Sequence, residues 1–331
     1  MSEFSKGVFT FFVSESLSVI IAILLKDDKS RMARVFIIGS IISGFIAFVV
    51  LPFSTKVVLP SFPASTNQIT IAPTSTPLTP TLGIGSNMIS PKDGMTLMYV
   101  PAGNFLMGSA ASDPNAQADE KPQHTVYLDA FWIDKNDVTN AMYAKCVGAG
   151  ICNQPIFLDS QTQKGYYSNS QFDNYPVINV DWNQANAYCQ WAGRGLPTEA
   201  QWEKAARGTD GRIYPWGNDS PNNNLLNYNN AVGDTTEVGK YPNGASPYGV
   251  LDMAGNVWQW VNDWYDSNYY SNSPSSNPLG PSSGQYRVLR GGTWFHDDSY
   301  VRSADRDGVG TWNVYDLVGL LGFRCAMSAA K

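Results

Sequence analysis

The residues with the most evident chemical potential lie near the C-terminal end, in the segment 290–308, RGGTWFHDDSYVRSADRDG. Its carboxylates and arginines at first suggest acid/base pairs, and His296 beside Asp297 and Asp298 resembles the start of a metal site. No third and fourth metal ligand is evident nearby in the sequence, which favours a histidine that contacts a ligand or solvent. Arginine forks commonly tie carbonyls and carboxylates together in loop-rich folds, so Arg290 and Arg324 are assigned structural roles.

Aromatic side chains with short polar neighbours are typical of surfaces that recognise sugars or proteins, because rings exclude water while polar groups fix orientation. Trp294 is expected to fill the core, whereas loop residues are expected to meet a ligand. Arg302 and Arg306 fit either role and are kept with the binding set. The candidate ligand-binding residues are Phe295, His296, Asp297, Asp298, Tyr300, Arg302 and Arg306, with Trp312, Asn313, Tyr315 and Asp316 just beyond.

The four cysteines, Cys146, Cys152, Cys189 and Cys325, show no C-x-x-C spacing, and the chain holds only two histidines. A zinc cage is therefore not expected. An even number of cysteines in an exported domain predicts two disulfides. The second histidine, His124, precedes an expected strand, and a packing or hydrogen-bonding role is favoured for it.

Charged residues make up only 15% of the chain, below the roughly 25% of ordinary soluble domains. This composition, rich in Gly, Asn, Ser, Trp and Tyr, predicts a loop-rich fold. The net charge of -6 and the absence of a basic cluster in the C-terminal part argue against nucleic acid as a partner.

The N-terminal third differs in composition from the rest. Residues 35–53 carry no charge and predict a transmembrane helix, and the basic residues just before them predict that everything after residue 53 is extracellular. Residues 8–25 are expected to lie in the membrane interface or to form a second span. The predicted organisation is an N-terminal segment (1–34), a membrane helix (35–53), a disordered Pro/Ser/Thr-rich stalk (54–93) and one domain (94–328).

Within that domain, residues 125–134, TVYLDAFWID, alternate as a half-buried strand would. Two capping boxes, Asp181 with Gln184 and Thr198 with Gln201, predict helices that end at Gly193 and Gly208. A third helix is expected over residues 139–147.

Seven ordered motifs, among them MYVPAGNFLMGS, LPTEAQWEKAARG, DMAGNVWQW, RVLRGGTW and GFRC, resemble the formylglycine-generating enzyme, or sulfatase-modifying factor, family over roughly Met95 to Met327. The resemblance implies an α+β, C-type-lectin-like fold of the sulfatase-modifying subtype. It also implies that Cys189 and Cys325 form the family's structural disulfide, which leaves Cys146 and Cys152 to pair across a short loop.

The family's oxidase holds copper with two cysteines that follow the paired glycines. This sequence has His296 and Val301 in those two positions, so no catalytic residue is assigned. One imidazole and one isopropyl group cannot replace two soft thiolates, and copper is not expected as a cofactor.

The resemblance further implies a structural calcium ion at the loop 252–259, through Asp252, Gln259 and the carbonyls of Gly255 and Val257. The family usually has Glu at the position of Gln259, so binding is expected to be weaker. A tight turn held by hydrogen bonds is the alternative. A second calcium loop would use Asn227 and the Tyr228 carbonyl.

These observations together predict a membrane-anchored extracellular module whose partner is a protein, peptide or glycan. The alternative from another class is an oxidase that converts a sulfatase cysteine to formylglycine, and a third possibility is an accessory subunit. The segment 290–308 also resembles the diversified ligand-binding regions of C-type-lectin-like proteins.

Overall fold

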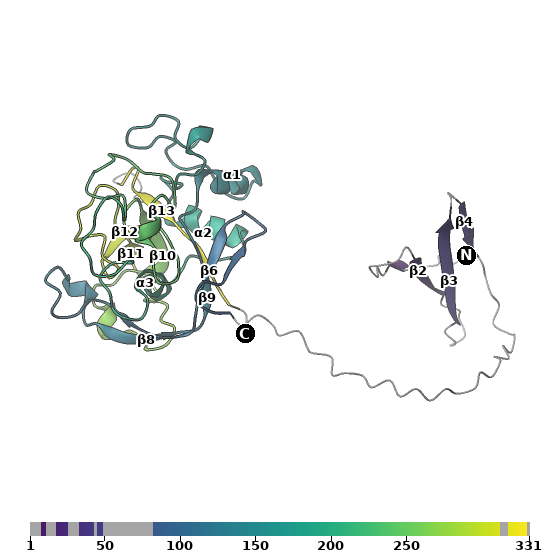
Figure 1. Cartoon of the computed structure of the whole chain (residues 1–331), viewed down its shortest axis with the longest axis horizontal. Coiled ribbons are helices and arrows are strands. Elements are labelled where there is room, and N and C mark those ends of the chain that lie inside the picture. Colours follow the sequence, from purple (N-terminus) through teal and green to yellow (C-terminus); the bar gives the residue numbers. More distant parts are fainter. Residues whose placement is uncertain are drawn as a thin grey trace. The chain divides into compact units, whose positions relative to one another are not determined.

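The computed structural model describes residues 82–311 and 317–329 and, before them, four strands of the N-terminal part. The chain divides into two compact units, Met1–Thr76 and Pro77–Lys331. The N-terminal unit contains one antiparallel sheet in the order β1-β2-β3-β4 (Figure 1). Its strands are β1 (Val8–Thr10), β2 (Ser18–Leu25), β3 (Ala33–Ile42) and β4 (Phe45–Phe48).

The transmembrane helix predicted over residues 35–53 is not found. Most of that segment belongs to β3 and β4, in keeping with its many valine, isoleucine and phenylalanine residues, which favour strands. No helix in the described part of the chain has both the length and the apolar character to cross a membrane. Most of the predicted stalk lies outside the described residues, although residues 82–93 are described and include strand β5.

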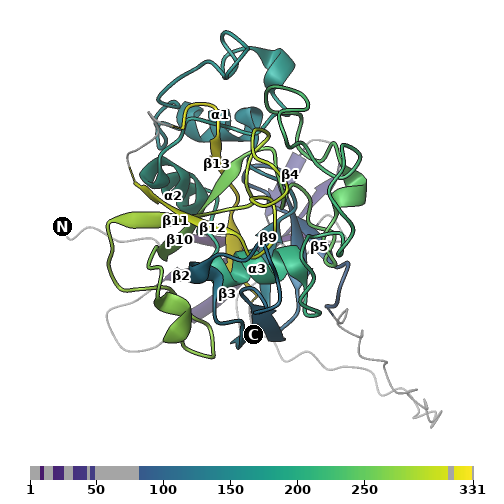
Figure 2. The ribbon, with the colours of Figure 1, turned by 90° about the vertical axis from the view of Figure 1, so that its left-hand side faces the viewer.

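The C-terminal unit is of mixed α+β class and rich in loops, as predicted (Figure 2). One mixed sheet has the order β12-β11-β10-β13, a second has the order β14-β9-β6-β5, and β7 pairs with β8. The strands are β5 (Asn87–Ile89), β6 (Thr96–Val100), β7 (Gly103–Met107), β8 (His124–Leu128), β9 (Phe131–Asp134), β10 (Trp258–Trp264), β11 (Tyr286–Arg290), β12 (Arg306–Gly310), β13 (Leu321–Phe323) and β14 (Ala326–Ser328).

The α-helices of this unit begin where the sequence predicts them. They are α1 (Asn140–Gly148), α2 (Trp182–Trp191) and α3 (Glu199–Arg207), with N-caps Thr139, Asp181 and Thr198. The last two caps form the predicted capping boxes, which satisfy backbone N–H groups that have no partner inside the helix. Short 3-10 helices lie at Ala118–Glu120, Ser170–Phe172, Pro242–Gly244 and Tyr269–Ser271.

The segment predicted as one half-buried strand, 125–134, is two strands in different sheets. β8 alternates between core and surface beside β7, but all four residues of β9 are buried. β9 lies between β14 and β6, so both of its edges are paired, and its side chains are buried on both faces of the sheet. Burial of this kind removes the alternation on which the sequence prediction relied.

Two disulfides cross-link the unit, and both predicted pairings are confirmed. Cys189 of α2 is bonded to Cys325, which lies between β13 and β14. Cys146 of α1 is bonded to Cys152 just after the helix. All four cysteines of the chain are therefore disulfide-bonded.

Candidate ligand-binding site

The segment rich in functional groups forms the connection between strands β11 and β12, hereafter the β11–β12 loop (residues 291–305). Its first two residues are Gly291 (φ +97°) and Gly292 (φ +69°). A Cβ on Gly292 would lie 2.8 Å from the carbonyl oxygen of Tyr300, which only glycine avoids. The loop then returns to β12, which pairs antiparallel with β11, so a rigid hairpin holds its two ends.

The tip of this loop exposes large aromatic side chains. Phe295 is 59% and Tyr300 is 38% exposed, whereas Trp294 is buried as predicted. The ring of His296 lies between them, with centroids 6.1 Å from Phe295 and 4.7 Å from Tyr300. An exposed aromatic cluster on a fixed loop is the kind of surface that anchors a binding partner.

His296 itself is half-buried. Its Nδ1 lies 2.9 Å from Thr293 Oγ1, and its ring meets the edge of Trp258 at 5.5 Å. Burial lowers the pKa of His296, although Asp297 opposes the effect. The imidazole is therefore mostly neutral at pH 7 and acts as a third ring of the cluster rather than as a cation.

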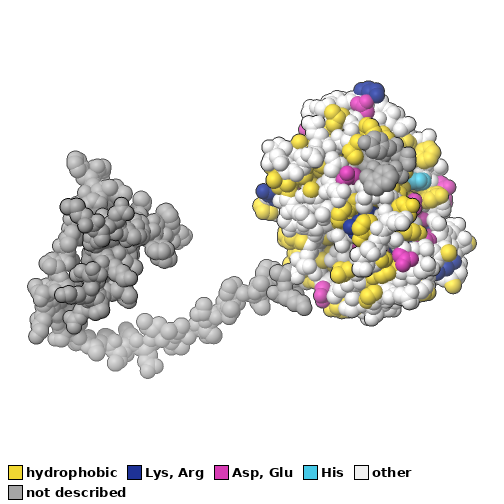
Figure 3. All heavy atoms as spheres, turned by 180° about the vertical axis from the view of Figure 1, so that it is seen from behind, with side chains coloured by type: hydrophobic (Ala, Val, Ile, Leu, Met, Phe, Trp, Pro, Cys, Tyr) yellow, Lys and Arg dark blue, Asp and Glu magenta, His cyan; other side chains and the backbone are white. Residues whose placement is uncertain are grey.

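Asp297 and Asp298 at the tip of the loop are exposed, whereas Asp305, the third carboxylate of the loop, is buried. Asp297 Oδ1 accepts hydrogen bonds from the backbone N–H and hydroxyl of Ser299, and these lower the pKa of Asp297. The Asp298 carbonyl accepts a bond of 3.4 Å from the hydroxyl of Tyr214, whose ring stacks on Trp216 with centroids 5.1 Å apart. Figure 3 shows a face on which hydrophobic and acidic side chains are interspersed and Lys and Arg are few.

A neighbouring segment, residues 228–230, supports the loop from outside the hairpin. Asn229 donates its backbone N–H to the His296 carbonyl at 2.7 Å, and Asn230 donates to the Trp294 carbonyl at 2.8 Å. Both asparagines adopt positive φ, which asparagine tolerates better than most residues. The shape of the loop is therefore fixed by contacts far away in sequence.

Arg302 and Arg306 do not belong to the exposed surface, which corrects their assignment as ligand contacts. Arg302 is 1% exposed and donates two hydrogen bonds of 2.7 Å to Glu120. Arg306 is 3% exposed and forms the same fork with Glu199 at 2.7 and 2.8 Å. Both guanidinium groups form hydrogen-bonded ion pairs with buried carboxylates and so attach the loop to the rest of the domain.

The structural roles predicted for the other two arginines agree with their placement. Arg290 is fully buried and pairs with Glu203, and Arg324 is fully buried and pairs with Asp137 at 3.2 Å. His124 packs as predicted, with Nδ1 3.0 Å from the Pro122 carbonyl. Trp312, Asn313, Tyr315 and Asp316 lie outside the described residues.

The two positions that hold copper in the oxidases of the resembling family do not fit that metal here. Val301 is fully buried and packs in an apolar cluster with Tyr214, Leu226 and Ala254. His296 is engaged with Thr293, and no free thiol remains in the chain. A site for a cuprous ion needs soft donors that converge, and these side chains do not supply them.

The predicted calcium loop 252–259 is only partly suited to a cation. Gln259 Oε1 already accepts hydrogen bonds from Trp202 Nε1 (2.7 Å) and Arg324 Nε (2.6 Å), which uses both lone pairs. Asp252 accepts from the Gly239 N–H at 2.8 Å, and burial raises its pKa to about 6. The Gln259 oxygen therefore has no free lone pair for a cation, and only Asp252 and nearby carbonyls remain to bind an ion.

The second predicted calcium loop offers one unsatisfied oxygen. Asn227 donates through Nδ2 to the Asp234 carbonyl at 2.8 Å, while its buried Oδ1 has no hydrogen-bond partner. The Asp234 carboxylate instead accepts from Ser160 and Thr162, and the predicted Tyr228 carbonyl accepts from the Ala231 N–H at 3.0 Å. Among the described residues no three His, Cys, Asp or Glu side chains converge on a common metal position.

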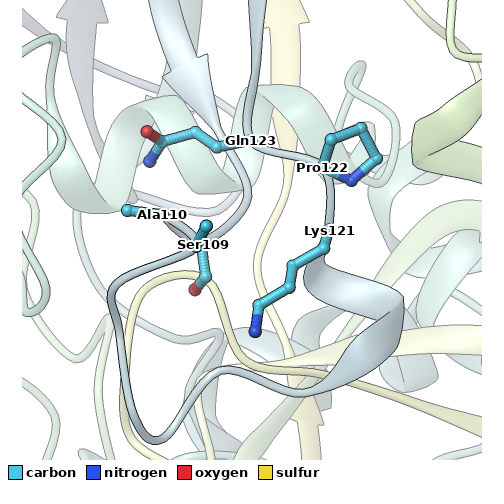
Figure 4. Close-up of a pocket in the computed structure, with 6 residues that line it drawn as sticks. Ser109, Ala110, Lys121, Pro122 and Gln123 are labelled. Carbon is cyan, nitrogen blue, oxygen red and sulfur yellow. The ribbon is translucent and has the colours of Figure 1, made fainter.

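An open pocket of about 530 Å³, which the sequence analysis did not predict, lies beside the connection that precedes β8. Figure 4 shows the side chains of Ser109 and Lys121 extending in the same direction from two segments of the connection between β7 and β8. A second, adjoining pocket shares Ser109 and is lined also by Asp113 and Ile213. No local sequence motif indicates these residues, because the pocket forms where two segments of the β7–β8 connection pack together.

Comparisons with known proteins place the chain among proteins of one domain type. A model of the sulfatase-modifying factor enzyme 1-like domain matches residues 86–329. The formylglycine-generating enzyme of Streptomyces coelicolor is 35% identical over 290 residues, covering 72% of this chain and 91% of that enzyme. The serine/threonine-protein kinase pkn1 of Chlamydia caviae is 37% identical over 245 residues, covering 70% of this chain but only 37% of the kinase.

The fold leads to the same conclusion. The structure of PvdO from Pseudomonas aeruginosa superposes with a TM-score of 0.64 and 25% sequence identity, covering 75% of this chain and 100% of PvdO. The matched region contains both disulfides, all three α-helices and the β11–β12 loop. The chain therefore belongs to the sulfatase-modifying factor enzyme 1-like domain family.

Proposed function

We propose that this chain is a ligand-binding member of the family, which recognises a protein, peptide or glycan through the tip of the β11–β12 loop and does not oxidise cysteine. The observation that carries the proposal is the identity of the residues at the two positions where the family's oxidase has its copper-binding cysteines. His296 and Val301 supply no thiolate, and the four cysteines are all bonded to each other. The family scaffold is thus retained while the donor pair for copper is lost.

The exposed tip supports a role in recognition. Phe295 and Tyr300 place apolar rings in solvent on a loop whose backbone is held by buried ion pairs. Such preorganised rings lose little conformational entropy when a partner covers them. Asp297 and Asp298 beside the rings can fix the orientation of that partner through hydrogen bonds.

The proposed location is the outer side of a membrane. This part of the proposal rests on the uncharged segment 35–53 and on the basic residues Lys26, Lys29, Arg31 and Arg34 that precede it. Fractionation of the full-length chain with membranes, together with cleavage of the domain by protease added outside intact cells, tests it. A chain found in the soluble fraction contradicts it.

A calcium ion bound near Asp252 or Asn227 belongs to the same proposal and serves structure rather than catalysis. The orphaned Asn227 oxygen and the Asp252 carboxylate are the groups that favour it.

Restoring the missing thiols provides a sharp test of the copper argument. We expect the wild-type chain to bind no stoichiometric cuprous ion, and we expect the double variant His296→Cys/Val301→Cys to gain such binding, because cysteine is close to valine in volume. The measurement is anaerobic titration with a colorimetric cuprous chelator as competitor. One cuprous ion bound by the wild type near His296 contradicts the proposal.

A further inference from the structure

Arg287 on β11 lies between two tryptophan rings on one side of the sheet. Its guanidinium carbon is 3.5 Å from the ring centroid of Trp264 on β10 and 3.8 Å from that of Trp182 at the start of α2. The three side chains are all half-buried. Strand pairing fixes this arrangement, because Trp264 is the direct cross-strand partner of Arg287, and Trp182 is held by a bond from Nε1 to the Val261 carbonyl.

The guanidinium uses little of its hydrogen-bonding capacity. Nη1 donates to the Asn262 carbonyl, while Nε is buried with no hydrogen-bond partner. Arginine has five N–H donors, so the group retains donors that no described residue accepts. The indoles cover both faces of the guanidinium, so an acceptor approaches at its edge, where Nη2 has no hydrogen-bond partner among the residues that the structure describes and is not buried.

The charge of Arg287 is also uncompensated. Among residues 82–311 and 317–329, the other seven arginines each lie within ion-pair distance of a carboxylate, and Arg287 does not. The charge of Asp263 acts on Arg287, but burial and Glu199 raise the pKa of Asp263 to about 8, so that this carboxyl group is largely protonated at neutral pH. Burial lowers the pKa of Arg287 to about 10, which leaves it charged at pH 7 but poorly solvated.

We propose that Arg287, between Trp182 and Trp264, is a binding site for the carboxylate group of a small ligand, separate from the tip of the β11–β12 loop. A carboxylate accepts the unused donors and neutralises the half-buried cation, so the interaction is charge-assisted. The flanking indoles exclude water from the contact and strengthen it. The carboxylate comes either from a free organic acid or from an acidic sugar whose ring also touches an indole edge.

The test uses the full-length chain and three small molecules: acetate, glucuronate and neutral glucose. Binding is followed by tryptophan fluorescence and by the NMR signal of the Arg287 guanidinium. We expect saturable changes with both carboxylates, with dissociation constants on the order of 1–10 mM, and none with glucose. Tighter binding of glucuronate than of acetate identifies the sugar as the source, and equal binding identifies the free acid.

Substitutions make the assignment specific. Arg287→Gln is expected to weaken carboxylate binding at least about tenfold, and Arg287→Lys to weaken it less, because Lys keeps the charge but loses the fork. Arg212→Gln is the matched control, since Arg212 is paired with Asp210 at 2.6 Å and its loss should change nothing. The melting temperature of each variant is checked first.

The wild-type NMR titration stands even if Arg287→Gln does not fold. The inference is overturned if the Arg287 signal is unaffected by both carboxylates, if glucose changes it equally, or if a folded Arg287 variant binds as the wild type does. Phe295→Ala should leave this binding unchanged, so the result is independent of the proposed loop function.

Discussion

Removing the Cys189–Cys325 disulfide should destabilise the domain more than removing the Cys146–Cys152 disulfide. The two bonds close loops with sequence separations of 136 and 6 residues. In the chain-entropy model these separations correspond to about 5 and about 2 kcal/mol of stabilisation at 25 °C. Typical domains are stable by roughly 5–15 kcal/mol, so loss of the longer closure removes a large part of the total.

The assay is urea unfolding of two double variants, Cys189→Ala/Cys325→Ala and Cys146→Ala/Cys152→Ala, with the unfolding slope fitted in each case. Cys189, Cys325 and Cys146 are fully buried and Cys152 nearly so, so the cost of removing sulfur from the core is similar in the two variants and the difference reports loop closure. Equal losses, or a larger loss for the shorter loop, would mean that loop closure does not determine the stabilisation.

Glu120→Gln should cost about 3–5 kcal/mol of unfolding free energy, because it leaves the buried Arg302 without its main counter-charge; thermal denaturation measures this, and a loss below about 1 kcal/mol would contradict it. The folded-state pKa of Asp263, about 8, lies above its unfolded value, so the protonated carboxyl group contributes fully to the free energy of unfolding below about pH 4, and this contribution is lost as the pH rises toward 8. Asp263→Asn should therefore flatten the decline of stability with pH, measured by unfolding across this range. Phe295→Ala and Tyr300→Ala should weaken partner binding at least about tenfold in titration calorimetry with an unchanged melting temperature, whereas a lowered melting temperature would indicate a packing role. Calcium should raise the melting temperature and a chelator should lower it, and an identical melt in both conditions would exclude the ion.

Local signals in the sequence were sufficient for the helices. The boxes Asp181–Gln184 and Thr198–Gln201 act within one turn, so neighbouring residues alone determine where α2 and α3 begin. The strand prediction over 125–134 was less accurate, because the break at Asp129 and the complete burial of β9 depend on β6 and β14, which are distant in sequence.

The site shows the same division. The exposed rings of Phe295 and Tyr300 follow from loop position and residue type, which the sequence displays. The burial of Arg302 depends on Glu120, 182 residues away, and that of Arg306 depends on Glu199, 107 residues away. Contacts of such separation leave no local pattern, so these arginines were wrongly assigned to the ligand surface.

Long-range contacts also limit what the sequence can predict about the calcium loop. The sequence presents Gln259 as a possible oxygen donor, but Trp202 and Arg324 already occupy that oxygen. Only the three-dimensional arrangement shows that the Gln259 oxygen already accepts two hydrogen bonds from within the protein.

The proposed absence of cysteine oxidation is tested most directly by mass spectrometry of a cysteine-containing sulfatase peptide incubated with the full-length chain, cuprous ion and oxygen. We expect the peptide cysteine to remain a thiol while the Streptomyces coelicolor enzyme, run in parallel, converts it. Formation of the peptide aldehyde by this chain would show that it does oxidise cysteine.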